Sequence, residues 1–290
     1  GAESARAAGA CDIPAATVLR SGATGPDVLC LEHALAARGL LAERVVDGRF
    51  RSATTTALRR LQRRTGLPRT GVAGTDEFEA LGVRRPTLVN RSLTGPQRQG
   101  RPDVVVIGDS ITAQGAQAQL TALEDAGYDA PVVDGGLGRS IFDAGTSTRS
   151  GLEVIERTAA QFRGTGGPAL WVIALGTNDA GNRELDSQGP YDQRIRTVLA
   201  AIPETGTVLW VAPAVQSPSL ISGRERQLAA FNEALGRVAA DTPRLQILRW
   251  DAYAAWPGVL GSDGVHLTEP AGVEVRVAVV TNAVKAALPT

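Results

Sequence analysis

The feature that most constrains the fold is the alternation, from residue 103 onward, of short apolar runs with segments of helical length. The runs are rich in β-branched residues and almost continuously apolar, as is typical of parallel strands buried on both faces. They are VVVIG (104–108), PVVDG (131–135), ALWVIALG (169–176), TVLWVAP (207–213) and LQILRW (245–250). The helical segments lie at about 113–126, 151–163, 190–202, 223–240 and 270–287. This order predicts a three-layer α/β/α domain, built on a doubly wound parallel five-stranded sheet, over residues 103–290.

Polar residues follow several of these runs and gather the groups that ester hydrolysis needs. Ligands of doubly wound sheets bind beyond the carboxyl ends of the strands. The sequence places GDS (108–110), GLGRS (136–140) and GTND (176–179) there, and SDGVH (262–266) lies in the loop before the last helix. A serine hydroxyl needs a base to take its proton, and the base needs a third group to orient it. These segments therefore predict a serine-hydrolase site.

The chain has two histidines, and only His266 lies in this domain. Asp263 lies three residues earlier in the same tight loop, so its carboxylate can hold one imidazole nitrogen while the other faces Ser110. We expect Ser110 as the nucleophile, His266 as the base and Asp263 as the orienting carboxylate. The expected oxyanion donors are the backbone N–H groups of Ser110 and Gly138 and the side-chain amide of Asn178.

The four segments, in this order, resemble the motif blocks of the SGNH, or GDSL-like, hydrolase superfamily over about residues 103–287. The resemblance implies a flavodoxin-like SGNH fold and assigns the same roles to Ser110, Gly138, Asn178, Asp263 and His266. Two positions depart from the family pattern. Ile111 stands where Leu is usual, and Asp134 stands where the second block often has Asn. The second departure leaves Gly136 open as the alternative to Gly138.

Further residues of three types, Asp, Trp and Arg, invite a role. Asp109 and Asp179 flank the active residues, but carboxylates beside strand ends usually accept backbone hydrogen bonds. Trp250 and Trp256 are core or rim aromatics, or line a sugar-binding cleft. Arg139 is the best candidate for contacting an anionic or sugar substrate.

Before residue 103 the pattern is different and predicts a small all-α domain over residues 11–82. Val28, Leu31 and Leu35 recur at helical spacing, a second helix ends at Gly66, and a third lies at about 75–81. The order LRSGATGPDVLCLEHALAARGL, VDGRFRSATTTALRRLQRRTGLPRTGVAG and FEALG resembles the three-helix peptidoglycan-binding domain of secreted bacterial wall enzymes. Glu32 stands where that family usually has Gln. Residues 83–102, rich in Arg, Pro and Gly, are expected to form a semi-extended linker.

Cysteine usage points to an oxidising compartment. Cys11 and Cys30 are the only cysteines and both lie in the small N-terminal segment, which suits one disulfide, although two buried thiols are the alternative. Together with the wall-binding resemblance, this predicts a secreted protein, extracellular or associated with the cell wall. The chain contains no Met, not even at position 1, so we expect a processed form or a trimmed piece.

Charge and composition limit the partners. The net charge is zero, but residues 103–290 carry 14 basic and 21 acidic residues, which argues against nucleic acid as a partner. Arg59, Arg60, Arg63 and Arg64 cluster on one expected helix and form either a solvated face or a contact for an anionic wall polymer or membrane surface. No apolar run approaches the length of a membrane span. We expect a monomer. We also expect that no cofactor or metal is needed, because the sequence shows neither a metal-ligand cluster nor a phosphate loop.

The stretches around the four blocks resemble, more loosely, the catalytic domains of bacterial peptidoglycan O-acetyltransferases and their esterase relatives. This implies a small acyl group, usually acetyl, on a wall glycan as the partner. The short catalytic region, without a long apolar insertion, also favours a small acyl group. We expect an esterase that de-acetylates peptidoglycan or an attached polysaccharide. An O-acetyltransferase with the same triad and a wall-binding protein with a vestigial site are the alternatives.

Overall fold

The computed structural model describes residues 19–83, 89–96, 102–180, 189–216, 221–261 and 263–289. The chain forms two compact units. The first comprises Gly1–Thr87 with the Gly261–Glu269 loop, and the second comprises Leu88–Leu260 with Pro270–Thr290. Each unit has its own hydrophobic core.

The first unit contains the helices α2 (Pro26–Ala37), α3 (Ser52–Thr65) and α4 (Thr75–Ala80), with a 3₁₀ turn η1 (Glu43–Val45) between α2 and α3. The predicted stripe of Val28, Leu31 and Leu35 is confirmed, because all three side chains are fully buried. Helix α3 ends as predicted at Gly66, which adopts the left-handed conformation (φ 75°) and donates its N–H to the Gln62 carbonyl. The four α3 arginines all lie on the exposed face.

Glu32 has a structural role in this unit. Its carboxylate is fully buried and accepts hydrogen bonds from the N–H groups of Asp47 (3.0 Å) and Gly48 (2.9 Å) and from Thr54 Oγ1 (2.7 Å). These bonds fasten the turn before α3 to α2. Cys30 is buried and disulfide-bonded, and Cys11, the only other cysteine, lies outside the described residues.

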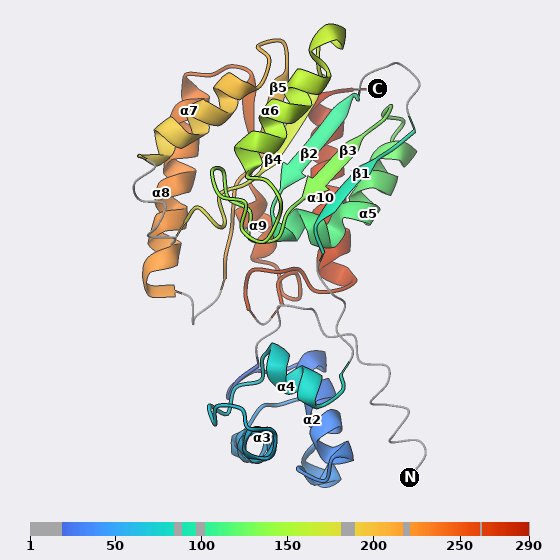
Figure 1. Cartoon of the computed structure of the whole chain (residues 1–290), viewed down its shortest axis with the longest axis vertical. Helices are drawn as coiled ribbons and strands as arrows, with labels where there is room; N and C mark the ends of the chain where they lie inside the picture. Colours follow the sequence, from blue (N-terminus) through green and yellow to red (C-terminus); the bar gives the residue numbers. More distant parts are fainter. Residues whose placement is uncertain are drawn as a thin grey trace. The chain divides into compact units, whose positions relative to one another are not determined.

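The second unit is built on a sheet with the order β1-β3-β2-β4-β5-β6 (Figure 1). Its strands are β1 (Arg91–Thr94), β2 (Val104–Gly108), β3 (Val132–Gly135), β4 (Leu170–Ala174), β5 (Thr207–Val211) and β6 (Leu245–Leu248). The five predicted strands are all present and pair in parallel, with Gly108 of β2 opposite Gly135 of β3.

The expectation of a linker throughout 83–102, and of a five-stranded sheet, needs correction at β1. Residues 91–94 pair antiparallel with β3, Ser92 lying opposite Asp134, and make a sixth strand at the sheet edge. β1 lies at the sheet edge and is mostly exposed. The segment RSLT therefore contains no apolar run, and no alternation of apolar and polar residues, that would indicate a strand in the sequence. Its pairing depends on a partner about 40 residues away, which only the tertiary fold supplies.

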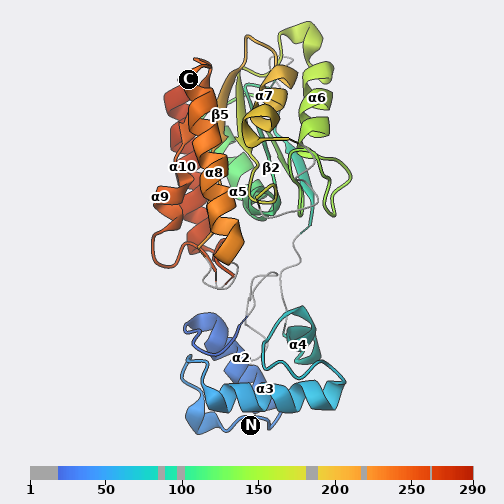
Figure 2. The same cartoon turned by 90° about the vertical axis from the view of Figure 1, so that its left-hand side faces the viewer.

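Helices cover both faces of the sheet and complete the predicted three layers (Figures 1 and 2). One face packs against α5 (Ser110–Asp125) and α10 (Ala271–Ala287). The other packs against α6 (Gly151–Gln161), α7 (Tyr191–Ala201) and α8 (Ile221–Ala240), with the fully buried Trp171 and Trp210 in the core between them. The short helix η2 (Arg163–Thr165) precedes β4, and the short helix α9 (Trp250–Ala254) follows β6. The last strand therefore ends at Leu248, two residues before the end of the predicted run.

Candidate active site

Ser110 is the first residue of α5, directly after β2, and is half-buried. Asp109 caps the helix by accepting a 3.0 Å hydrogen bond from the Ile111 N–H at its Oδ1. The amino end of a helix carries a partial positive charge, which stabilises negative charge that develops there. The local sequence GDSI thus places the Ser110 hydroxyl where an alkoxide or oxyanion is favoured.

Glycines allow the close approach of backbone around this turn. A Cβ on Gly108 would overlap Thr112 Oγ1 and lie 3.0 Å from Ala174 Cβ. A Cβ on Gly135 would overlap the backbone of Ala113 in the first turn of α5. The ends of β2 and β3 can therefore press against the start of α5 only because both positions lack a side chain.

The structure corrects the expectation that Arg139 contacts substrate. Its side chain is 4% exposed and is committed within the protein. The guanidinium pairs with Asp134 Oδ1 at 2.6 Å, donates to the Gly108 carbonyl at 3.1 Å and donates to the Arg149 carbonyl at 3.2 Å. Arg139 therefore fastens the loop after β3 to the ends of β2 and β3. Asp134, at the position where the motif often has Asn, is its counter-ion.

The loop after β3 offers two glycine amides, and their surroundings differ. The Gly136 N–H already donates to the Gly108 carbonyl at 3.1 Å. Gly138 is exposed, has a positive φ of 69°, and donates its N–H to no acceptor within the described part of the chain. Asn178, half-buried after β4, donates from Nδ2 to the Arg139 carbonyl at 3.0 Å, which ties the second and third blocks together. An amide nitrogen carries two protons, so this bond leaves a second N–H.

Asp179 is a buried support for these loops. It is 1% exposed, and both of its oxygens accept from the Ile141 N–H, at 3.1 and 3.2 Å. Burial raises the pKa of Asp179 to about 7, the charge of Asp109 adds to the rise, and the Ile141 bond and Arg194 oppose it. Asp179 thus accepts backbone hydrogen bonds, as expected of a carboxylate beside a strand end. Its carboxyl group ionises near neutral pH.

Asp263 and His266 form a pair within their own loop. His266 Nδ1 lies 2.7 Å from Asp263 Oδ2, and Asp263 Oδ1 accepts from the N–H groups of Val265 (2.9 Å) and His266 (3.0 Å). Burial alone would raise the pKa of Asp263, but the hydrogen bond and charge of His266, with the two backbone bonds, hold it below its ordinary value. Asp263 is thus an ionised carboxylate that orients the imidazole through Nδ1.

The candidate residues are divided between the two units. Ser110, Gly138 and Asn178 belong to the unit that contains the sheet, whereas Asp263 and His266 lie on the loop grouped with the first unit. In the sheet-containing unit, Asn178 is tied to the loop of Gly138 through the Arg139 carbonyl, and in the other set Asp263 contacts His266.

Sequence reasoning missed Asn90, which supports the loop of Gly138. Asn90 Oδ1 accepts from the Leu137 N–H at 2.7 Å, and its Nδ2 donates to the Thr146 carbonyl at 3.3 Å. It lies in the segment read as a linker, where no periodic pattern marks it. The two tryptophans singled out in the sequence differ in their exposure. Trp250 is buried, with Arg276 Cζ 4.5 Å from the centre of its ring, whereas Trp256 is 53% exposed.

No group of three or more His, Cys, Asp or Glu side chains in the described part of the chain could hold a metal ion. None of its helices combines the length and apolarity needed to cross a bilayer.

Comparison with known proteins places both units. Residues 24–81 match the model of a peptidoglycan binding domain, and residues 106–271, more than half of the chain, match that of the GDSL-like Lipase/Acylhydrolase family. No curated protein matches. Among solved structures, the lipase/acylhydrolase from Enterococcus faecalis is 19% identical, with a TM-score of 0.50 over 63% of this chain and 95% of that one, and supports the fold.

Two other solved structures are similar over single units. The SleB N-terminal domain is 36% identical over 24% of this chain and 94% of its own, with a TM-score of 0.23. The catalytic domain of Streptococcus pneumoniae peptidoglycan O-acetyltransferase A is 19% identical over 64% and 94%, with a TM-score of 0.48. The family match, the strand order and the motif residues at the strand ends agree, and the chain belongs to the GDSL-like lipase/acylhydrolase family.

Proposed function

We propose that this protein is a secreted serine esterase that removes acetyl groups from peptidoglycan or an associated wall polysaccharide. The observation that carries the chemistry is the 2.7 Å contact between Asp263 Oδ2 and His266 Nδ1, which leaves Nε2 to act as the base. The wall polymer as substrate is supported by the peptidoglycan-binding match on the same chain. A small acyl group is supported by the absence of a long apolar insertion in the sequence of 103–290.

In the proposed reaction these residues act in successive steps. His266 Nε2 takes the proton of Ser110 Oγ as this oxygen attacks the ester carbonyl carbon. The N–H groups of Ser110 and Gly138 and the second N–H of Asn178 stabilise the oxyanion. His266 then protonates the departing sugar oxygen. Water then attacks the acyl-serine as His266 takes its proton, and His266 returns this proton to Ser110 Oγ as the acyl–oxygen bond breaks. Acetic acid leaves and ionises to acetate, and the free enzyme is restored.

The Gly138 N–H has no acceptor among the described residues, which supports this glycine over Gly136 as the donor. A preorganised donor must point at the oxyanion without first breaking another bond, and removal of one such donor costs about 3–4 kcal/mol in the transition state. Gly136 would have to give up its bond to the Gly108 carbonyl. Arg139, Asn90 and Asp179 are the supports that hold the donor loop in place.

The test measures acetate released from O-acetylated walls by the intact protein, by Ser110→Ala and by Ser92→Ala. Ser92 is an exposed serine on the edge strand β1 and serves as the matched control. Acetate release should fall by at least about a thousandfold in Ser110→Ala, since a triad acts as a unit, and stay unchanged in Ser92→Ala. Equal release by all three proteins would refute the esterase proposal. Transfer of acetyl to a chitooligosaccharide in excess of hydrolysis would favour the acetyltransferase.

A further inference from the structure

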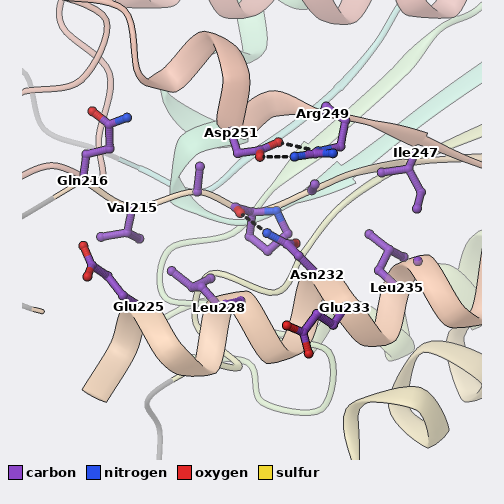
Figure 3. A pocket seen from close by; sticks show the side chains of 15 residues that line it. Val215, Gln216, Glu225, Leu228, Asn232, Glu233, Leu235, Ile247, Arg249 and Asp251 are labelled. Atoms are coloured by element: carbon purple, nitrogen blue, oxygen red, sulfur yellow. Dashed lines mark hydrogen bonds and ion pairs between the residues drawn. The ribbon is translucent and has the colours of Figure 1, made fainter. Parts of the chain in front are cut away.

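A pocket of about 560 Å³ lies beyond the carboxyl ends of β5 and β6 (Figure 3). Three segments of the sheet-containing unit line it: the stretch that follows β5 (Ala212–Gln216), residues of α8 between Glu225 and Gly236, and the residues that end and follow β6 (Ile247, Arg249 and Asp251). In Figure 3, Leu228 and Asn232 reach from α8 toward the β5 segment, and the Arg249–Asp251 pair lies on the far side. This is the edge of a doubly wound sheet at which ligands bind.

The pocket shares a wall with the GTND loop. A Cβ on Gly176 would lie 2.9 Å from Pro213 Cγ and 2.7 Å from the Phe231 ring, so the loop that carries Asn178 packs directly on Pro213. Pro213 also lines the pocket, and its carbonyl is fixed by a 3.0 Å hydrogen bond from Asn232 Nδ2. Pro213 therefore separates the pocket from the loop that carries Asn178.

The polar lining consists mostly of hydrogen-bond acceptors. Glu225 and Glu233 lie exposed at its rim, and Asn232 Oδ1 is buried and accepts no hydrogen bond from any described residue. The cation of the lining, Arg249, is neutralised by Asp251 through two bonds of 2.9 and 2.6 Å. Three carboxylates against one guanidinium leave the pocket acidic, so it favours hydroxyl or ammonium donors and repels carboxylates and phosphates.

The apolar lining and the volume suit a sugar better than an acyl chain. Val215, Leu228, Leu235 and Ile247 supply apolar surface for the C–H face of a pyranose ring. Pockets for small organic ligands measure about 300–1,000 Å³, whereas an acetyl group occupies only a small part of such a volume. A longer hydrocarbon would desolvate the rim carboxylates without offering them a donor, which is costly.

We propose that this pocket is a glycan subsite, which holds an uncharged or amino-bearing hexose next to the ester-bearing sugar and excludes acidic sugars. This inference rests on the proposed function, because it names the part of the substrate that this function leaves open. It assigns the recognition of the glycan chiefly to the acceptors on α8, which are Glu225, Glu233 and Asn232.

Isothermal titration of the full chain tests the proposal with three probes: tri-N-acetylchitotriose (uncharged), chitotriose (cationic) and tri-galacturonate (anionic). Gly236→Trp would fill the pocket, because Gly236 lines it on α8 and a Cβ there meets no atom within 4 Å. Gly164→Trp is the matched control, since Gly164 is equally open but lies before β4, at the opposite end of the strands. Binding by the peptidoglycan-binding unit is common to all variants, so only differences are read.

Gly236→Trp should raise the Kd for tri-N-acetylchitotriose at least tenfold, and Gly164→Trp should change it less than twofold. As a second variant, Glu233→Lys should weaken chitotriose at least tenfold more than the uncharged trimer. Equal Kd values for the two tryptophan variants, or a Gly236→Trp substitution that weakens binding of the anionic trimer as much as that of the uncharged trimer, would overturn the subsite. Faster hydrolysis of a decanoyl than an acetyl 4-nitrophenyl ester, lost in Gly236→Trp, would overturn it in favour of an acyl pocket.

These readouts separate the two proposals. The titration involves no ester bond, so sugar binding that Gly236→Trp abolishes would support the subsite even if no acetate were released from walls. In that case the esterase proposal alone would fail. Conversely, acetate release with identical sugar binding in all variants would retain the esterase and remove the subsite.

Discussion

The charge of Asp179 makes the stability of the sheet-containing unit depend on pH in a way that can be calculated. Its pKa is raised from 3.8 to about 7, chiefly by burial. In the unfolded chain Asp179 therefore ionises from about pH 4, whereas in the folded protein it stays protonated until about pH 7. A raised acid pKa stabilises the fold fully below the unfolded value, and this stabilisation is lost as the pH rises through 7.

The perturbation is Asp179→Asn, which keeps an oxygen acceptor for the Ile141 N–H and cannot ionise. With 1.36 kcal/mol for each pKa unit, the wild-type protein should lose about 2 to 3 kcal/mol relative to the variant between pH 5 and pH 8. The loss stops growing above about pH 8, because Asp179 is then ionised in both states.

Urea unfolding followed by tryptophan fluorescence measures this difference. All four tryptophans, at 171, 210, 250 and 256, lie in the sheet-containing unit, so the signal reports that unit alone. Asp192→Asn is the control. Hydrogen bonding to Arg237 lowers the pKa of Asp192, so this carboxylate is ionised in both states from pH 5 to 8 and its variant should show a constant difference. A constant difference for Asp179→Asn as well would refute the raised pKa.

Substitutions at three further positions test the supports of the two units. Arg139→Met should destabilise the sheet-containing unit by about 3–5 kcal/mol, because it leaves the Asp134 carboxylate without its cation; unfolding within 1 kcal/mol of wild type by fluorescence would contradict this. Gly108→Ala should lower the Tm and the ester-hydrolysis rate together, since a methyl group would overlap Thr112, and an unchanged Tm would show that the turn can relax. Glu32→Ala should destabilise the first unit by about 2–4 kcal/mol, because buried donors lose their acceptor, and Glu32→Gln by less. The first unit should then unfold at a lower urea concentration by circular dichroism, while the fluorescence transition of the sheet-containing unit stays unchanged. If both transitions shifted together, the units would unfold as one.

The sequence predicted much of the sheet because strand burial is a local signal. Runs such as 104–108 and 170–174 are apolar on both faces only when helices cover both sides of a parallel sheet, so composition identified the five parallel strands. The edge strand β1 had no such signal, since most of its residues are exposed. Its partner strand β3 lies far along the chain, and nothing within RSLT indicates that the two segments pair.

The residues for the chemistry were also determined locally. Ser110 lies at a strand end that begins a helix, and Asp263 and His266 are close enough in sequence for one loop to pair them at 2.7 Å. The function of Arg139 was misjudged because its partners come from three separate segments, and burial by those segments turns a surface-type residue into a buried support.

The sequence by itself thus determined where the five parallel strands lie along the chain, and it predicted the candidate reacting side chains and the types of their partners. The tertiary structure decided which groups are already engaged: the Gly136 amide is bound to the end of β2, whereas the Gly138 amide is not. It also created the pocket between β5, β6 and α8. The physical reason is that a hydrogen bond or a cavity wall needs groups from different segments, and their meeting is fixed by packing and not by neighbours along the chain.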